Sequence, residues 1–404
     1  MAVAALPRVY ALSMKQLYTQ VIADVRDGKA GTIHPELYRA YCENLRKGVS
    51  GVLGQDSYGD RYSDMCDQFE ANVARFAAYK AFHATRQLEH QLADRDGVER
   101  SPEEFDRMAR AVLNTFNRYQ AAEYNTAVSR ARTAKQWADF SQGDNMFLFP
   151  NLRWIPSRSA NPREEHMPFY DLVLPKTDHF WTVNQPGTLW NCKCDWEETD
   201  DPVDHRDLTP DQLAEYRTEK GSIHAKGLEG NPAQTGQIFT DQCTYVKNSP
   251  QGTEKSCRKA NRNMMAKQGR EQNKSRRITY EIDGTEHEFD FGSFGNGKHK
   301  VDICHHYAAS MFGDVDFWLK NEILLNPQSY FDNGVTIGNA AIDPHNSGAA
   351  TQRLKDCTNR FFYIKTRLAN GKEVILHVGR YKDSGKLYLY SASKELPEYA
   401  RTPQ

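Results

Sequence analysis

The sequence predicts a multidomain α+β protein, and three observations lead to that class. Helical periodicity with few breakers extends over about the first 140 residues. The composition then changes to segments rich in Pro, Trp, Phe and Asn, and the last hundred residues alternate between apolar and polar residues, as strands do. We therefore expect a mainly helical N-terminal region, a compact mixed central module, and a C-terminal helix followed by an antiparallel meander.

Residues 1–140 form the predicted helical region. Apolar residues recur in it at the three-to-four spacing of a helix face, as in Phe69, Val73, Phe76 and Ala77. Ser101 followed by Pro102 indicates a helix start, because serine caps a helix and proline fits its first turn. Few breakers follow in 105–139, so we expect one long helix there or two helices broken near Ala121.

Residues 141–245 are predicted to form a compact module of short strands and ordered loops.

Two segments of opposite charge flank the end of this module. Residues 195–215 hold nine acids and one Arg, and residues 246–277 hold ten Lys and Arg against two Glu. The second segment has few large apolar groups, so we predict a solvated basic linker; the alternative is contact between 246–277 and packaged DNA.

Residues 278–404 carry the clearest strand pattern and are predicted to be an α+β domain. An alternating segment ends at Asp283-Gly284, which indicates a hairpin turn. A helix is expected over about 302–325. Three further alternating segments, separated by turns at Asn370-Gly371 and Asp383-Ser-Gly385, predict the meander: 360–367, 372–379 and 386–390.

Composition narrows the function classes. The 404 residues carry 52 Lys and Arg against 53 Asp and Glu, and this near-neutrality argues against a uniformly basic nucleic-acid-binding protein. No apolar run approaches the roughly 18 residues of a membrane span, so we expect no membrane partner. The N-terminus lacks the pattern of a secretory signal. The eight cysteines are dispersed, which indicates reduced thiols in a cytoplasm.

The most specific motifs lie in the central module. In order they read Leu152-Arg-Trp-Ile-Pro-Ser-Arg158, Arg163-Glu-Glu-His166, Leu172-Val-Leu-Pro175, Asp178-His-Phe-Trp181, Asn184-Gln-Pro-Gly187 and Trp190-Asn-Cys-Lys-Cys194. This series resembles the central domain of phage Mu F-type minor head proteins, also called head morphogenesis proteins. The segments Gly230-Asn-Pro-Ala233 and Gly236-Gln-Ile-Phe239 are also similar, so the resemblance covers about 60–245. Where the family usually has Trp-Gly-Cys-Arg-Cys, this chain has Trp190-Asn-Cys-Lys-Cys194.

The resemblance implies a structural role and no catalytic activity for the central module. A protein of this family acts in procapsid assembly of a phage or prophage, close to the portal. We therefore expect portal and capsid proteins as partners, and a location in the virion and in the cytoplasm of the bacterial host.

His166, Cys192 and Cys194 are candidate ligands of Zn²⁺, with His179 or Cys243 as the fourth ligand. The alternative is a core without a cofactor, in which His166 and Arg158 hydrogen-bond to backbone carbonyls and the thiols pack as small apolar groups. Trp181 and Trp190 are expected to be core anchors in that case. Zinc knuckles usually separate their cysteines by two to four residues, so the Cys-x-Cys spacing favours the cofactor-free interpretation.

The C-terminal part suggests an alternative function. Head proteins of this kind often carry an extra C-terminal domain, and the helix-then-meander order resembles the metal-independent ribonucleases of the barnase/colicin/RelE-like group. Such a toxin would cleave RNA with a base, an acid and a cation on the phosphate. The candidates are His377 with Arg380, Lys365 or Arg367, where a turn would have to bring Arg380 round to the side of His377. The simpler interpretation of His377 is a half-buried strand residue bonded to a neighbour.

Overall fold

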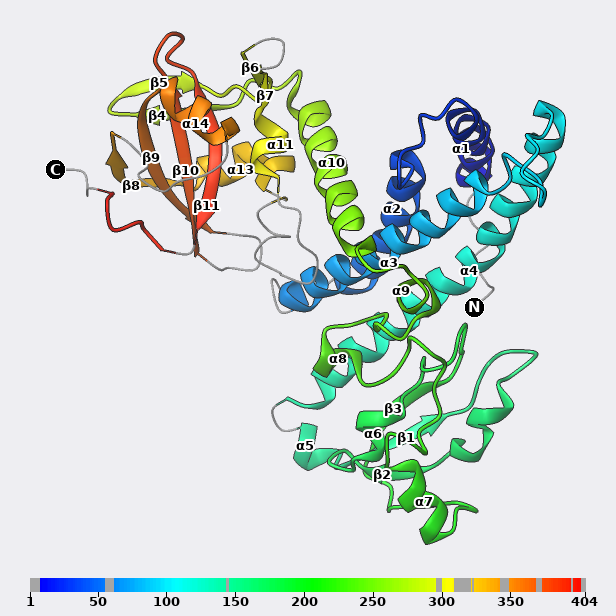
Figure 1. The fold of residues 1–404 in the computed structure, drawn as a ribbon. Helices are drawn as coiled ribbons and strands as arrows, with labels where there is room; N and C mark the ends of the chain where they lie inside the picture. The colour runs from blue at the N-terminus through cyan, green and yellow to red at the C-terminus, as the bar shows by residue number, and fades with distance from the viewer. Residues whose placement is uncertain are drawn as a thin grey trace. The chain divides into compact units, whose positions relative to one another are not determined.

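The computed structural model (Figure 1) describes residues 8–54, 62–142, 145–295, 300–308, 321, 323–341, 349–367, 373–393 and 395–400. These residues form an α+β protein with a helical N-terminal region and a C-terminal antiparallel meander, which confirms the predicted class. The chain divides into two compact units, 1–57 with 65–257 and 58–64 with 258–404. No helix among the described residues is long and apolar enough to cross a membrane.

Four helices begin the first unit: α1 (Arg8–Arg26), α2 (Pro35–Leu53), α3 (Ser63–Glu89) and α4 (Pro102–Phe140). The Ser101 hydroxyl accepts a hydrogen bond from the Glu104 N–H at 3.3 Å and so starts α4, as the sequence predicts. Helix α4 then continues through Ala121 without a break. At about 1.5 Å per residue it is roughly 58 Å long. It packs against α2, and Gly48 of α2 lies directly against the ring of Tyr124.

The central part of the first unit is a three-stranded antiparallel sheet. Strand β1 (Asn151–Ile155) lies between β2 (Val173–Pro175) and β3 (Asp195–Thr199), with Trp154 opposite Trp196. Short elements surround the sheet: α5 (Asn145–Leu148), the 3₁₀ helix η2 (Glu164–Phe169), α6 (Phe180–Val183), α7 (Pro210–Tyr216), α8 (Pro232–Thr235) and α9 (Thr244–Lys247). Helix α4 packs against both β3 and α8. The short strands and ordered loops agree with the expectation for this segment.

The basic segment 246–277 contains helix α10 (Thr253–Asn273). The apolar residues Met264, Met265 and Ala266 of this helix are buried. Three of its cations are engaged within the second unit. Arg262 donates to the carbonyl of His305 at 2.8 Å, Arg270 pairs with Asp302, and Arg277 lies 2.6 Å from Glu286. DNA contact through the other cations of this segment stays a prediction.

The second unit holds the predicted hairpin and meander. Strands β4 (Thr279–Ile282) and β5 (Thr285–Glu288) pair across Asp283 and Gly284, whose positive φ angles of 52° and 72° suit a two-residue hairpin turn. Strands β9 (Thr358–Arg367), β10 (Glu373–Tyr381) and β11 (Leu387–Ser393) form the meander. The expected turn at Asn370-Gly371 lies outside the described residues.

A fourth strand, β8 (Val335–Ala340), pairs with β9 and was not predicted. The remaining elements of the unit are β6 (Ser293–Phe294), β7 (Val301–Asp302), α11 (Ile303–Tyr307), α13 (Pro327–Asp332) and α14 (Ala349–Asp356). The helix expected over 302–325 coincides with α11 at its start, and residues 309–320 and 322 of that stretch lie outside the described part of the chain.

Candidate functional site

Three of the predicted site residues meet in the core of the central part. His166 lies on η2, and Cys192 and Cys194 lie in the segment that leads into β3. The His166 Nδ1 atom is 3.4 Å from the Cys192 sulfur and 3.9 Å from the Cys194 sulfur. All three side chains are buried, and their ligand atoms lie within 4.8 Å of one another. We call these residues the His–Cys–Cys cluster.

Within the described residues, the cluster contains no fourth side chain of a metal-ligating type. The proposal of His179 or Cys243 as the fourth ligand is therefore wrong. His179 precedes α6 as its N-cap residue, and Cys243 occupies the same position at α9. Cys243 packs against the backbone of Gly227, so closely that a Cβ added to Gly227 would lie 2.5 Å from the Cys243 Cβ. Cys243 therefore lies against another loop and not in the cluster.

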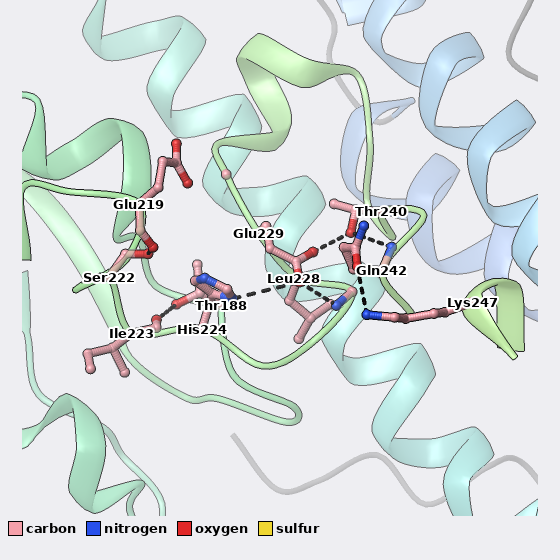
Figure 2. Close-up of polar contacts among 12 residues, drawn as sticks. Thr188, Glu219, Ser222, Ile223, His224, Leu228, Glu229, Thr240, Gln242 and Lys247 are labelled. Carbon is pink, nitrogen blue, oxygen red and sulfur yellow. Dashed lines mark hydrogen bonds and ion pairs between the residues drawn. The ribbon is translucent and has the colours of Figure 1, made fainter. Parts of the chain in front are cut away.

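Thr188 fixes the tautomer of His166. The Thr188 Oγ1 atom lies 3.0 Å from the carbonyl oxygen of Gln185, 2.9 Å from that of Ile223 and 3.3 Å from the Nε2 atom of His166. Carbonyl oxygens only accept, so the hydroxyl hydrogen goes to them and the Thr188 oxygen accepts from the Nε2–H group. The lone pair of His166 Nδ1 then faces the two sulfurs. Figure 2 shows the bond from Thr188 to Ile223.

Two buried donors lie beside the Cys194 sulfur. They are the indole N–H of Trp154 and the hydroxyl of Tyr170, and both are within hydrogen-bonding reach of this sulfur. Both groups act on the pKa of Cys194 and lower it. The Trp154 side chain is fully buried, so water does not satisfy its N–H group. A sulfur that carries negative charge is the acceptor that this arrangement suits.

The two cysteines titrate as one pair. A hydrogen bond from the Cys194 thiol and the neighbouring ring of His166 lower the pKa of Cys192. The adjacent Cys192 sulfur and burial raise the pKa of Cys194. The cluster therefore favours the thiolate form of Cys192 over that of Cys194, and a buried thiolate requires a neighbouring cation. Its burial leaves no surface on which a substrate could meet the sulfur.

The two tryptophans of the motif series have different environments. Trp181 is fully buried, its ring lies 6.4 Å from that of Trp154, and its indole N–H donates to the Pro175 carbonyl at 3.1 Å. It is thus a core anchor, as expected. Trp190 is partly buried and stacks on Phe239 at 5.6 Å.

Arg158 does not join the core. Its side chain is exposed, because the chain leaves the sheet for solvent after β1, and its backbone N–H donates to the Lys193 carbonyl at 3.5 Å. The expectation that its guanidinium hydrogen-bonds inside the core is therefore wrong. His166 likewise contacts a hydroxyl and two sulfurs instead of a backbone carbonyl.

Sequence reasoning missed a buried arginine on α4. The Arg130 guanidinium donates to the carbonyls of Leu228 at 2.8 Å and Gly230 at 3.1 Å, and burial lowers its pKa to about 10. It thereby holds the loop in which Glu229 accepts from the Gly227 N–H at 2.9 Å. Glu229 also accepts from the Thr240 hydroxyl (Figure 2). The sequence does contain one indication of this burial: Arg130 lies at three-to-four spacing from Ala127 and Ala134, on the buried face of α4.

The predicted nuclease residues are not assembled into one site. His377 Nε2 donates to the Ser393 hydroxyl at 2.7 Å, because that hydroxyl donates to the Glu395 carbonyl. His377 is therefore a half-buried strand residue bonded to a neighbour, as the simpler interpretation expects. The Lys365 ammonium lies 2.7 Å from the Glu373 carboxylate, and Arg367 lies 3.9 Å from it.

Arg380 lies on the opposite face of the sheet from His377. Strand β10 continues to Tyr381, so no turn brings Arg380 round, and the expectation that it reaches the side of His377 is wrong. Its guanidinium is 5.2 Å from the ring centroid of Phe362, whereas the ring of His377 lies 5.0 Å from that of Tyr363.

No family model, curated protein or solved structure matches the chain. The likeness to head morphogenesis proteins therefore rests on the ordered motif series. Much of that series lies in a single core, in which the ring of Trp154 contacts that of His166 and stacks on that of Trp181.

Proposed function

We propose that the chain is a minor head protein of a phage or prophage, a structural subunit in procapsid assembly near the portal. The observation that carries this proposal is the burial of the motif residues that resemble those of head morphogenesis proteins. His166, Trp181 and Cys192 are at most 3 % exposed. Groups buried to this extent do not reach a substrate, so these motifs maintain a fold and not a reaction.

An exposed apolar segment supports an assembly role. Met146, Phe147, Leu148 and Phe149 follow one another after α4, and all four are exposed, Phe147 by 88 %. Contiguous exposed apolar side chains mark protein-binding surfaces. We assign segment 146–149 to contact with an apolar surface of the portal protein.

The test is co-purification of the full chain with the portal protein encoded in the same genome. Wild-type protein should co-purify, and Phe147→Asp should lower the affinity about tenfold or more, as at an interface hot spot. The unfolding temperature should not change, since Phe147 is exposed. Val98→Asp, at another exposed apolar residue (63 %), is the matched control and should bind normally. Wild-type protein that does not bind the portal contradicts the proposal.

We also propose that the His–Cys–Cys cluster holds a Zn²⁺ ion with a structural role. Two thiolates and an imidazole are donors that zinc prefers, and they supply three of the four ligands of a tetrahedral site. The described residues supply no fourth side-chain ligand. With Zn–S near 2.3 Å and Zn–N near 2.0 Å, tetrahedral ligand atoms lie roughly 3.5 Å apart. The separations of 3.4 and 3.9 Å are close to this value. Such an ion would join η2 to the segment before β3 and stabilise the core.

Two features favour zinc over the cofactor-free interpretation. Thr188 holds His166 in the tautomer whose Nδ1 lone pair faces the sulfurs, as in metal-ligating histidines. The donors of Trp154 and Tyr170 lie beside Cys194, and a metal-bound thiolate accepts from such donors. A neutral thiol sulfur is only a weak acceptor for these donors, whereas a thiolate is a strong one.

A further inference from the structure

A polar pocket of about 280 Å³ opens in the first unit. Its lining consists of two cations, two hydroxyls and two amides: Ser157, Ser159, Asn161, Arg163, Asn191 and Lys193. In the part of the chain that the structure describes, no carboxylate and no aromatic ring lines it. Glu164 and Glu165, which follow Arg163, are exposed and do not belong to the lining.

The two cations of the pocket are available to an anion. Among the described residues, neither Arg163 nor Lys193 forms an ion pair with a carboxylate. One N–H of Arg163 donates to the Trp190 carbonyl at 2.9 Å, which orients the guanidinium and leaves its other donors for a ligand. Lys193 lies between the two cluster cysteines, so the cluster fixes its backbone.

The loop that carries the hydroxyls is held by its own hydrogen bonds. The Ser157 hydroxyl accepts from the Ser159 N–H at 3.3 Å, and the Ser159 hydroxyl accepts from the Asn161 N–H at 3.2 Å. On the other wall, the Asn191 side-chain oxygen accepts from the Asn125 amide at 3.1 Å. The pocket therefore has fixed walls before any ligand enters.

We propose that this pocket binds a phosphate of a nucleic-acid backbone, without reading its sequence. Arg, Lys, Ser and Asn are the side chains that contact phosphates in protein–DNA complexes. Since none of the described residues that line this pocket is aromatic, the pocket itself offers no platform on which a base could stack. The choice of duplex DNA as the nucleic acid rests on the proposed head function, whereas the phosphate chemistry rests on the pocket alone.

The experiment measures binding of a fluorescent duplex DNA to the full chain by anisotropy, over a range of salt concentrations. Lys193→Ala and Arg163→Ala should each weaken binding about five- to tenfold at low salt and reduce the slope of log K against log salt by about one. Lys193→Arg should retain most of the affinity. The matched control is Lys226→Ala, at an exposed lysine of the same unit outside the pocket, and its affinity should not change.

Three outcomes would overturn the proposal. These are wild-type protein that does not bind DNA, equal losses in Lys193→Ala and Lys226→Ala, and binding of inorganic phosphate without binding of DNA. Competition by inorganic phosphate at matched ionic strength, together with DNA binding, supports it. Lys193→Ala should still co-purify with the portal protein. If the wild type binds DNA through Lys193 but does not bind the portal protein, the proposed head function is contradicted and the phosphate site is not.

Discussion

The Nε2 atom of His166 lies 3.3 Å from the Oγ1 atom of Thr188, and this contact determines which nitrogen of the ring faces the two cysteines. The hydroxyl of Thr188 is itself oriented by the carbonyls of Gln185 and Ile223. Two backbone carbonyls that do not touch the sulfurs therefore determine which nitrogen of His166 faces them, and the proposed zinc site depends on this orientation.

Replacing Thr188 by valine should weaken zinc binding. Valine keeps the shape but removes the acceptor of the Nε2–H group, and loss of such an outer partner lowers metal affinity about 10- to 100-fold. Competition with a chromophoric chelator measures the change. Thr182→Val, at a partly buried threonine of α6, is the control. Equal affinities of Thr188→Val and wild type would contradict the role assigned to Thr188.

The glycines of α2 provide a matched pair for the packing of α2 on α4. A Cβ on Gly48 would lie 2.9 Å from the ring of Tyr124, whereas a Cβ on Gly51 would meet nothing within 4 Å. Gly48→Ala should lower the free energy of unfolding by about 1–3 kcal/mol through overpacking. Gly51→Ala should raise it by about 0.5–1 kcal/mol, since alanine favours the helix. Urea titration of both variants measures this difference, and similar effects would contradict the packing.

Asp178 should make stability depend on pH. Burial raises its pKa, but hydrogen bonds from Arg217 and from the Phe180 N–H outweigh burial and leave the pKa below its ordinary value. The carboxylate therefore stabilises the fold at neutral pH, and this stabilisation is lost as the pH falls through the folded-state pKa. Above about pH 5, Asp178→Asn should lower the free energy of unfolding by about 1.5–3 kcal/mol.

The difference between wild type and Asp178→Asn should shrink below about pH 4, where the wild-type carboxyl also takes up a proton. Urea titrations from neutral to acid pH measure it. Asp207→Asn, at an exposed residue, should show no such dependence. A difference that stays constant with pH would show that Asp178 acts through its shape and not through its charge.

The ribonuclease alternative predicts growth arrest when the full chain is expressed in a bacterium, relieved by His377→Ala. We expect neither arrest nor RNA degradation, because Lys365 is paired with Glu373 and Arg380 lies on the opposite face from His377. Growth curves and total-RNA gels measure this. Arrest that depends on His377 would restore the toxin hypothesis.

Local signals explain what could be predicted from the sequence. The start of α4 at Ser101 and the hairpin turn at Asp283-Gly284 depend on neighbouring residues only, and both were predicted. Strand β8 was missed because Gly338 interrupts its alternation and because its pairing with β9, which carries a register shift, is non-local. Period-two alternation correctly places His377 and Arg380 on opposite faces of the strand. The expectation that a turn brings Arg380 round failed because β10 continues to Tyr381.

The candidate site was predictable only in part. The Cys-x-Cys motif and His166 are visible as residue types, and the resemblance placed them in one module. The contribution of Thr188 depends on three segments that meet only in the fold, and the spacing rule for zinc knuckles argued against metal. The exposed position of Arg158 depends on where the chain leaves the sheet after β1.

The zinc content of the purified full chain tests the proposed metal centre most directly. Plasma mass spectrometry should find about one zinc per chain in the wild type and in Cys243→Ser, whose sulfur lies outside the cluster. Cys192→Ser and Cys194→Ser should each reduce this content to about a tenth or less. A wild-type chain that folds and is stable with no bound zinc, before and after zinc is added, would contradict the proposal.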